Sequence, residues 1–173
     1  GYANPVEHMG YQAFADQAAK AGVDALLTVD LPPEEVAEVN ARLQAVGIDT
    51  ILLVAPTSPD RRVEEIVRNA SGFVYYVSVK GVTGSGNLDV DAVQVGVSRI
   101  KQYTKLPVAV GFGIKDAASA RAVAAVADGV VVGSALVNCA AEALAGGGSD
   151  TAAMDAVANL VRELRQGVDS FAS

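Results

Sequence analysis

The chain has 173 residues, of which 51% are hydrophobic and 19% charged, and its formal net charge is −7 at pH 7. This composition predicts a globular chain with a sizeable core and excludes a disordered one. The negative charge, with no block of Lys and Arg, argues against a nucleic-acid surface. No apolar run reaches the roughly 18 residues that a membrane span needs.

One cysteine and one histidine limit the chemistry further. Cys139 lies in an alanine-rich stretch without metal-ligand spacing around it, and His8 stands alone near the N-terminus. We therefore expect no metal site. A lone cysteine fits a reducing, cytoplasmic location.

Apolar runs and helical periodicities alternate along the chain. Helical patterns are expected at residues 9–21, 33–47, 58–70, 91–103, 135–145 and 152–166, and strands at 24–29, 50–54, 74–77, 108–110 and 129–132. The strand at 108–110 also leads into a helix. Strands that read as continuous apolar runs are buried on both faces, which is typical of a parallel sheet.

This pattern predicts an α/β fold, an incomplete (βα)8 TIM barrel of about five complete βα units. Glycine and polar residues follow every strand, which favours a barrel over an open doubly wound sheet. The five units would contain strands 4–8. The chain opens Gly1-Tyr2-Ala3-Asn4-Pro5, in which Tyr2-Ala3 reads as the last residues of strand 3 in a fragment. Residues 1–173 would form a single partial barrel domain lacking strands 1, 2 and most of 3. Its unpaired strand edges should make it associate with another chain.

Two glycine turns follow the last two expected strands, Gly111-Phe112-Gly113 and Gly133-Ser134. Glycine leaves backbone N–H groups uncovered, and a helix that starts after Ser134 would point its positive end at the same place. Together they predict a phosphate pocket, although glycine also serves plain turn geometry. A third cluster, Ser78-Val79-Lys80-Gly81-Val82-Thr83-Gly84-Ser85, suits a lid that donates to the phosphate.

The segments YVSVKGVTGSGN, AVGFGIK, VVVGSALV, LLTVDLPPEE and Tyr2-Ala3-Asn4 occur in the order and spacing of one family. The chain resembles the α subunit of tryptophan synthase over essentially its whole length. That resemblance implies a (βα)8 barrel that cleaves indole-3-glycerol phosphate to indole and glyceraldehyde 3-phosphate by a retro-aldol reaction. It implies no cofactor of its own, because the pyridoxal phosphate belongs to the β subunit, on which the α subunit docks in an α2β2 heterotetramer.

The resemblance also implies roles for individual residues. Phosphate would be held at Gly84, Gly113, Gly133 and Ser134, and the indole pocket would be lined by Leu27, Tyr75 and Phe112. Thr83 would be the lid residue that orients a catalytic aspartate. The partner interface would involve Tyr2, Asn4, Asp30 and Pro32.

The reaction needs protonation of indole C3, a base that takes the glycerol hydroxyl proton, and stabilisation of positive charge near the indole N–H. Two carboxylates suit this work, one shielded by apolar walls and one held to the indole nitrogen. The resemblance places a glutamate and an aspartate before Gly1, so we expect no catalytic residue in this chain and no activity from 1–173 alone. The carboxylates that are present have other expected roles. Asp89 and Asp91 should cap a helix, and Glu34, Glu35, Glu64 and Glu65 should lie on solvated faces.

Two alternatives stay open. A non-catalytic subunit that binds phosphate and regulates a partner enzyme would share the glycine turns and the interface residues. Another phosphate-binding barrel enzyme would need a lysine at a strand end. None of Lys20, Lys80, Lys101, Lys105 and Lys115 lies inside an expected strand, so this alternative ranks lower.

Overall fold

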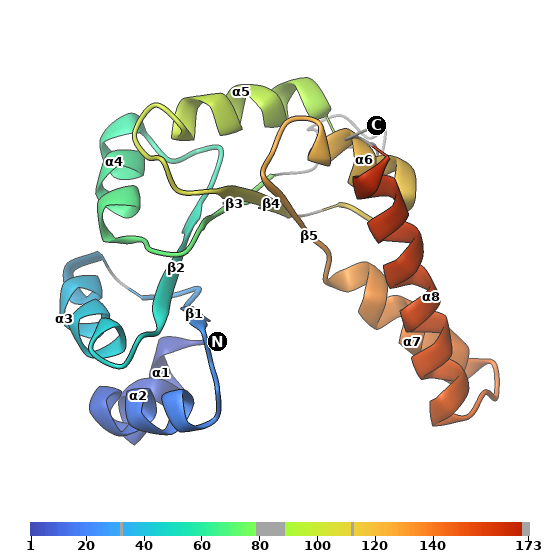
Figure 1. The fold of residues 1–173 in the computed structure, drawn as a ribbon, viewed down its shortest axis with the longest axis horizontal. Coiled ribbons are helices and arrows are strands. Elements are labelled where there is room, and N and C mark those ends of the chain that lie inside the picture. Colours follow the sequence, from blue (N-terminus) through green and yellow to red (C-terminus); the bar gives the residue numbers. More distant parts are fainter. Residues whose placement is uncertain (32, 79–88, 112, 171–173) are drawn as a thin grey trace. The chain divides into compact units, whose positions relative to one another are not determined.

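The computed structural model describes residues 1–31, 33–78, 89–111 and 113–170 (Figure 1). Five strands alternate with helices, as the sequence predicts. The strands are β1 (Ala25–Leu27), β2 (Asp49–Val54), β3 (Val74–Val77), β4 (Val108–Gly111) and β5 (Gly129–Val131). The helices are α1 (Ala3–Met9), α2 (Tyr11–Lys20), α3 (Pro33–Gln44), α4 (Asp60–Asn69), α5 (Val90–Ile100), α6 (Ala117–Ala124), α7 (Ser134–Ala145) and α8 (Asp150–Asp169).

The strands form one sheet in the order β1-β2-β3-β4-β5. β1 pairs with β2, β2 with β3, and β4 with β5, each in parallel. Consecutive parallel strands need a crossover, and each strand here is followed by a helix that supplies it. The predicted α/β class with a parallel sheet is therefore confirmed.

The chain divides into two compact units. The first contains Gly1–Tyr76 and Ser98–Val108. Its core includes a cluster of Ala15 and Ala18 from α2 with Val39 and Leu43 from α3, and Ile48 just before β2. This cluster explains the helical spacing of apolar residues in α2 and α3, since one face of each helix is buried against the other.

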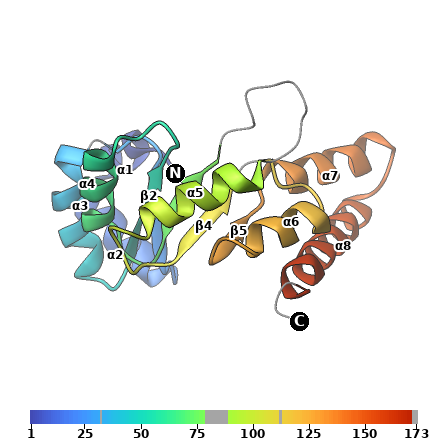
Figure 2. The same ribbon diagram turned by 90° about the horizontal axis from the view of Figure 1, so that it is seen from above.

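The second unit contains Val77–Val97 and Ala109–Ser173. Here α7 and α8 lie side by side in both ribbon views (Figures 1 and 2), and α8 also packs against α6. The approach of α6 and α8 is close because α8 presents a glycine: a Cβ on Gly167 would lie within 2.9 Å of the backbone carbon of Ala117.

The start of the chain differs from the prediction. Gly1 does run beside β1, since its amino group donates to Leu27 O at 2.6 Å and its carbonyl accepts from Val29 N at 3.2 Å. However, Ala3 already begins helix α1, so Ala3 and Asn4 are not strand residues. The reason is a cap from a distant part of the chain. The Asp30 carboxylate accepts a hydrogen bond from Ala3 N at 2.7 Å, and this gives the first backbone N–H of α1 an acceptor.

Candidate functional site

The carboxyl ends of β3, β4 and β5 meet at one edge of the sheet. Ser78, the residue after β3, donates from its backbone N–H and from its hydroxyl to the carbonyl oxygen of Gly111, the last residue of β4. Gly111 is in turn paired with Val131, the last residue of β5. Three loops therefore leave the sheet from adjacent positions, and all three start in the second unit.

Gly113 follows β4 in the loop that leads to α6. Its φ of 78° lies in the left-handed region, which favours glycine, and the residue is exposed. The next residue, Ile114, is buried with 4% of its surface exposed and anchors the loop. Asp116 then caps α6 by accepting from Ser119 N at 2.8 Å.

The N-terminus of α7 carries Gly133 as its N-cap and Ser134 as its first residue, and both are exposed. No side chain caps this helix and its first turn has no acidic residue, whereas α6 and α8 are capped by Asp116 and Ser149. The space beside Gly133 is open, with nothing within 4 Å of a Cβ built there. A helix N-terminus with free amide donors and open space is suited to an anion such as phosphate.

Leu27 and Tyr75 lie on the same face of the sheet in the first unit. Leu27 is paired with Ile51, and Tyr75 is paired with Leu53. Since residues two apart on a strand share a face, these four side chains line one face. Tyr75 is half-buried, and burial raises the pKa of its hydroxyl. This face is therefore apolar and carries a neutral phenol.

The expected interface residues come together at the start of α1. Tyr2 is 65% exposed, Asn4 and Asp30 are also exposed, and Asp30 is bonded to Ala3 N. The structure therefore brings Tyr2, Asn4 and Asp30 to one surface of the first unit. Four other predicted site residues, Pro32, Thr83, Gly84 and Phe112, lie outside the described residues.

Three of the carboxylates that the sequence analysis singles out have the expected roles, and Asp91 lies in the first turn of α5. Asp89 caps α5 by accepting from Ala92 N at 3.0 Å. Glu64 and Glu65 form exposed ion pairs with Arg68 and Arg62 on α4. Hydrogen bonds from Ser119 lower the pKa of the Asp116 carboxyl group, and a hydrogen bond from Arg165 lowers the pKa of the Asp169 carboxyl group. A general acid needs the opposite shift.

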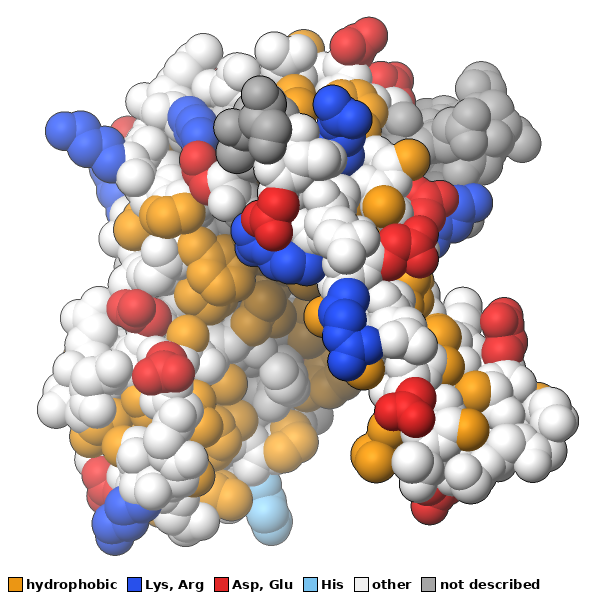
Figure 3. All heavy atoms as spheres, turned by 45° about the vertical axis from the view of Figure 1, so that its right-hand side comes forward, with side chains coloured by type: hydrophobic (Ala, Val, Ile, Leu, Met, Phe, Trp, Pro, Cys, Tyr) orange, Lys and Arg blue, Asp and Glu red, His pale blue; other side chains and the backbone are white. Residues whose placement is uncertain are grey.

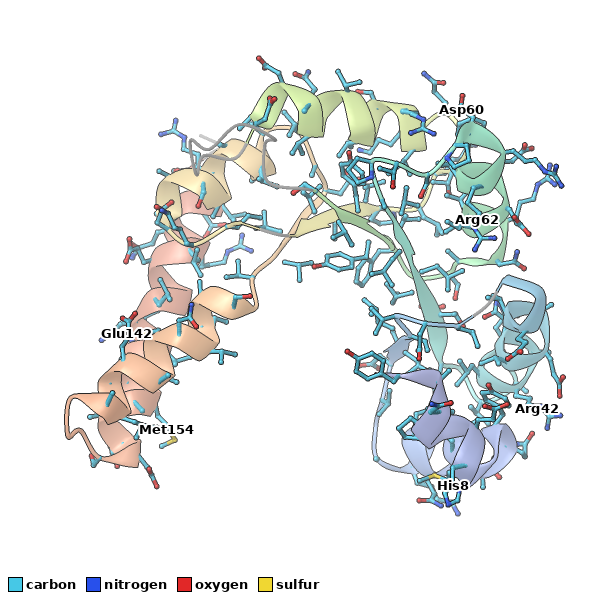
Figure 4. The ribbon with its side chains drawn as sticks, turned by 180° about the vertical axis from the view of Figure 1, so that it is seen from behind. His8, Arg42, Asp60, Arg62, Glu142 and Met154 are labelled. Atoms are coloured by element: carbon cyan, nitrogen blue, oxygen red, sulfur yellow. The ribbon has the colours of Figure 1, made fainter. Side chains whose placement is uncertain are left out.

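Sequence reasoning missed two contacts that position loops. One is the Ser78–Gly111 contact. The other is Arg99 of α5, which donates to Asp60 at 2.5 Å and to the carbonyl oxygen of Ser58 at the same distance. Asp60 opens α4 (Figure 4), so Arg99 holds the loop after β2. Both contacts involve a backbone acceptor far along the chain, and no local sequence pattern marks such a pair.

The described residues contain no group of three His, Cys, Asp or Glu side chains that could hold a metal ion. Cys139 is a free, half-buried cysteine. Among the helices in the described ranges, none has the length and hydropathy of a membrane span.

Comparison with known proteins decides the family. The sequence model of the family described as "Tryptophan synthase alpha chain" matches residues 1–168. The chain belongs to the tryptophan synthase alpha chain family. A relative from Thioalkalivibrio sulfidiphilus, called tryptophan synthase alpha chain, is 55% identical over 169 residues, which are 98% of this chain and 62% of the relative. A relative of the same name from Ralstonia nicotianae is 49% identical over 170 residues.

Solved structures agree with the family. The tryptophan synthase alpha chain from Legionella pneumophila matches all of this chain and 62% of its own length, with a TM-score of 0.86 and 39% identity. A structure of Mycobacterium tuberculosis tryptophan synthase matches 96% of this chain with a TM-score of 0.82 and 39% identity. The chain thus spans about three fifths of the length of these alpha chain proteins, and more than a third of each relative has no counterpart in it.

Proposed function

We propose that this chain is the phosphate-binding part of a tryptophan synthase α subunit that cleaves indole-3-glycerol phosphate to indole and glyceraldehyde 3-phosphate. The observation that supports this most is the uncapped start of α7, at the same sheet edge as Gly111 and Ser78. In this proposal β1–β5 are strands 4–8 of a (βα)8 barrel, and Gly1 and Tyr2 continue from strand 3. A phosphate site after the last two strands is common in such barrels.

The residues of this chain bind and orient the substrate. Amides at Gly113, Gly133 and Ser134 hold the phosphate, and the loop with Thr83 and Gly84 covers it. Leu27, Tyr75 and Phe112 contact the indole ring, and the neutral Tyr75 hydroxyl adds no charge there. Two carboxylates from the unmatched segment of the relatives move the protons: one protonates indole C3, and a base takes the glycerol hydroxyl proton. The carbon–carbon bond then breaks to give the aldehyde.

The exposed surface of Tyr2, Asn4 and Asp30 meets the β subunit in an α2β2 assembly, and Pro32, which is close to Asp30 in sequence, takes part in the same contact. That subunit carries the pyridoxal phosphate and receives the indole, so the α subunit needs no cofactor and no nucleic acid or membrane partner. A cytoplasmic location fits this role.

The experiment measures indole released from indole-3-glycerol phosphate. We expect no indole from 1–173 alone and turnover when 1–173 is co-expressed with the unmatched segment of the Thioalkalivibrio sulfidiphilus relative. Turnover by 1–173 alone would contradict the placement of the acid and base outside this chain. An assembled protein that binds glycerol 3-phosphate but releases no indole would instead favour a non-catalytic, phosphate-binding regulatory subunit.

A further inference from the structure

The first unit contains a cavity between the sheet and two of its helices. Its volume is about 130 Å³, and its walls come from the loop after β1 and from β2, α3 and α4. Leu27 and Tyr75, both within the described ranges, do not line it, so it is distinct from the predicted indole pocket. Its floor is buried and largely apolar, since Thr28 is 6%, Val36 3% and Leu52 6% exposed.

The mouth of this cavity carries one charge of each sign. Arg62 and Glu65 of α4 line it, with side chains that are 39% and 47% exposed. Arg62 lies on the side of α4 that is nearer to β2 (Figure 4). Charged side chains of both signs are interspersed over the surface in Figure 3, so an ion pair alone does not mark a site. The Arg62–Glu65 pair differs because it borders a cavity with a buried floor.

The contact between Arg62 and Glu65 is weak. Nη1 of Arg62 lies 3.3 Å from Oε2 of Glu65, and an exposed ion pair of this kind contributes little to stability. Each partner can therefore exchange the other for an equivalent group on a ligand at little cost. Asn69 also lines the cavity, and its Nδ2 donates to the carbonyl oxygen of Glu65 at 2.9 Å. This bond orients the Asn69 amide, whose oxygen adds an acceptor beside the Glu65 carboxylate.

We propose that the cavity binds a small α-amino acid with a branched apolar side chain, in its zwitterionic form. The ligand carboxylate accepts from the Arg62 guanidinium, and the ligand ammonium donates to the Glu65 carboxylate and the Asn69 amide oxygen. Both charges of α4 then keep a partner of opposite sign. A ligand with a single charge would leave one of them unpaired.

The size of the cavity selects the side chain of the ligand. A closed apolar cavity of about 150 Å³ takes a benzene ring. The 130 Å³ here suits the isopropyl group of valine, which would replace water next to Val36 and Leu52. The proposal concerns a site apart from the phosphate and indole sites and does not depend on the proposed function.

The cavity also borders the segment that carries Asp30. Val29 and Leu31 line it on either side of Asp30, whose carboxylate accepts from Ala3 N at the start of α1. A ligand in the cavity therefore contacts this segment directly. We expect bound valine to slow hydrogen exchange of the backbone amides at 28–31, which gives a readout independent of affinity.

The test measures binding of L-valine to 1–173 by saturation-transfer NMR and calorimetry. We expect saturable binding, with 3-methylbutanoate and isobutylamine, which each keep one charge of valine, binding at least about tenfold more weakly. Arg62→Gln and Glu65→Gln should each weaken valine binding about tenfold or more for the same reason. Arg61→Gln and Glu64→Gln are matched controls on the same helix, at described residues outside the cavity wall, and should leave the affinity unchanged. Circular dichroism checks that all four variants keep the fold.

Three results would overturn the proposal. The first is no saturable binding of valine, and the second is binding of either single-charge analogue as tightly as valine. The third is an equal loss of affinity in the Arg62 and Glu65 variants and in their controls, since that would place valine elsewhere on the chain. Indole release is not measured in this test, so its outcome and that of the proposed function are separate.

Discussion

Ser78 and Gly111 are joined by two hydrogen bonds that end on one atom. The backbone N–H of Ser78 lies 3.0 Å and its hydroxyl 3.1 Å from the carbonyl oxygen of Gly111. Val74 N makes the equivalent ladder bond to Pro107 O, the same number of residues earlier on each strand. The ladder between β3 and β4 therefore runs to the last residue before the loops, and the side chain of Ser78 adds a further bond where those loops begin.

The first prediction concerns this added bond. Ser78 is 3% exposed, so Ser78→Ala removes a buried hydrogen bond while the backbone bond remains. We expect a loss of about 1 kcal/mol in the free energy of unfolding, measured by urea titration. Ser98→Ala, on the exposed side of α5, is the control and should change stability by less than about 0.5 kcal/mol. Equal effects of the two variants would show that the hydroxyl of Ser78 does not hold the loop.

The second prediction concerns the start of α7. A carboxylate in Ser134→Asp would lie in the first turn of an uncapped helix, where it interacts favourably with the helix dipole by about 0.3–1 kcal/mol. The same charge should repel phosphate, so we expect slightly higher stability together with loss of measurable glycerol 3-phosphate binding in calorimetry.

The control for this prediction is Asn138→Asp, which adds the same charge at an exposed position one turn further along α7. It should leave phosphate affinity within about twofold, because the dipole effect falls off after the first turn. Unchanged phosphate binding in Ser134→Asp would show that the start of α7 is not part of the phosphate site.

The sequence predicted the strands well because each is a continuous apolar run between glycine or polar residues. Val74–Val77 is an example, since its bounds agree with the prediction. The glycine turns at Gly113 and Gly133 were also found, because an exposed glycine after a strand is a local signal. For each of these strands and turns, the residues that mark the element lie within a few positions of it in the sequence.

The sequence did not predict helix α1 or the role of Ser78, and the physical reason is the same. The cap of α1 is Asp30, 27 residues away in sequence from Ala3, and the acceptor for Ser78 is a backbone atom 33 residues away. Local propensity cannot identify such a partner. Without a cap of its own, the stretch after Tyr2 reads as the end of a strand.

The third prediction tests that distant cap. Asp30→Ala leaves Ala3 N without its acceptor, and we expect α1 to lose about 1 kcal/mol of stability against local opening. Hydrogen exchange of residues 4–9 should become faster, with exchange in α8 unchanged. Asp24→Ala, an exposed carboxylate before β1, is the control. Equal exchange in the two variants would mean that α1 does not depend on Asp30.

The fourth prediction is a pH dependence at the capping box of α6. Hydrogen bonds from the Ser119 hydroxyl and backbone lower the pKa of Asp116 below its ordinary 3.8. Because the folded pKa is lower than the unfolded one, the stabilisation is present above about pH 4 and is lost as the pH falls through the folded pKa. Asp116→Asn keeps an acceptor without titrating. We expect the wild type to be more stable than Asp116→Asn at pH 7 and the difference to shrink by pH 3 in urea titrations; a constant difference would contradict the ionised cap.

The fifth prediction concerns Gly167, where α8 approaches α6. Alanine is the better helix former by about 1 kcal/mol, so replacing an exposed helical glycine by alanine usually stabilises a protein. Gly167 is buried. Here the added Cβ would meet the Ala117 backbone, with its carbon and Cα at 2.9 Å and its carbonyl oxygen nearer still. Backbone cannot move aside as a flexible side chain can, and overpacking costs about 1–3 kcal/mol. We therefore expect Gly167→Ala to lower the melting temperature, whereas Gly146→Ala, where the nearest atom is at 3.5 Å, should leave it nearly unchanged. A rise in melting temperature for Gly167→Ala would mean that α6 and α8 do not pack this closely.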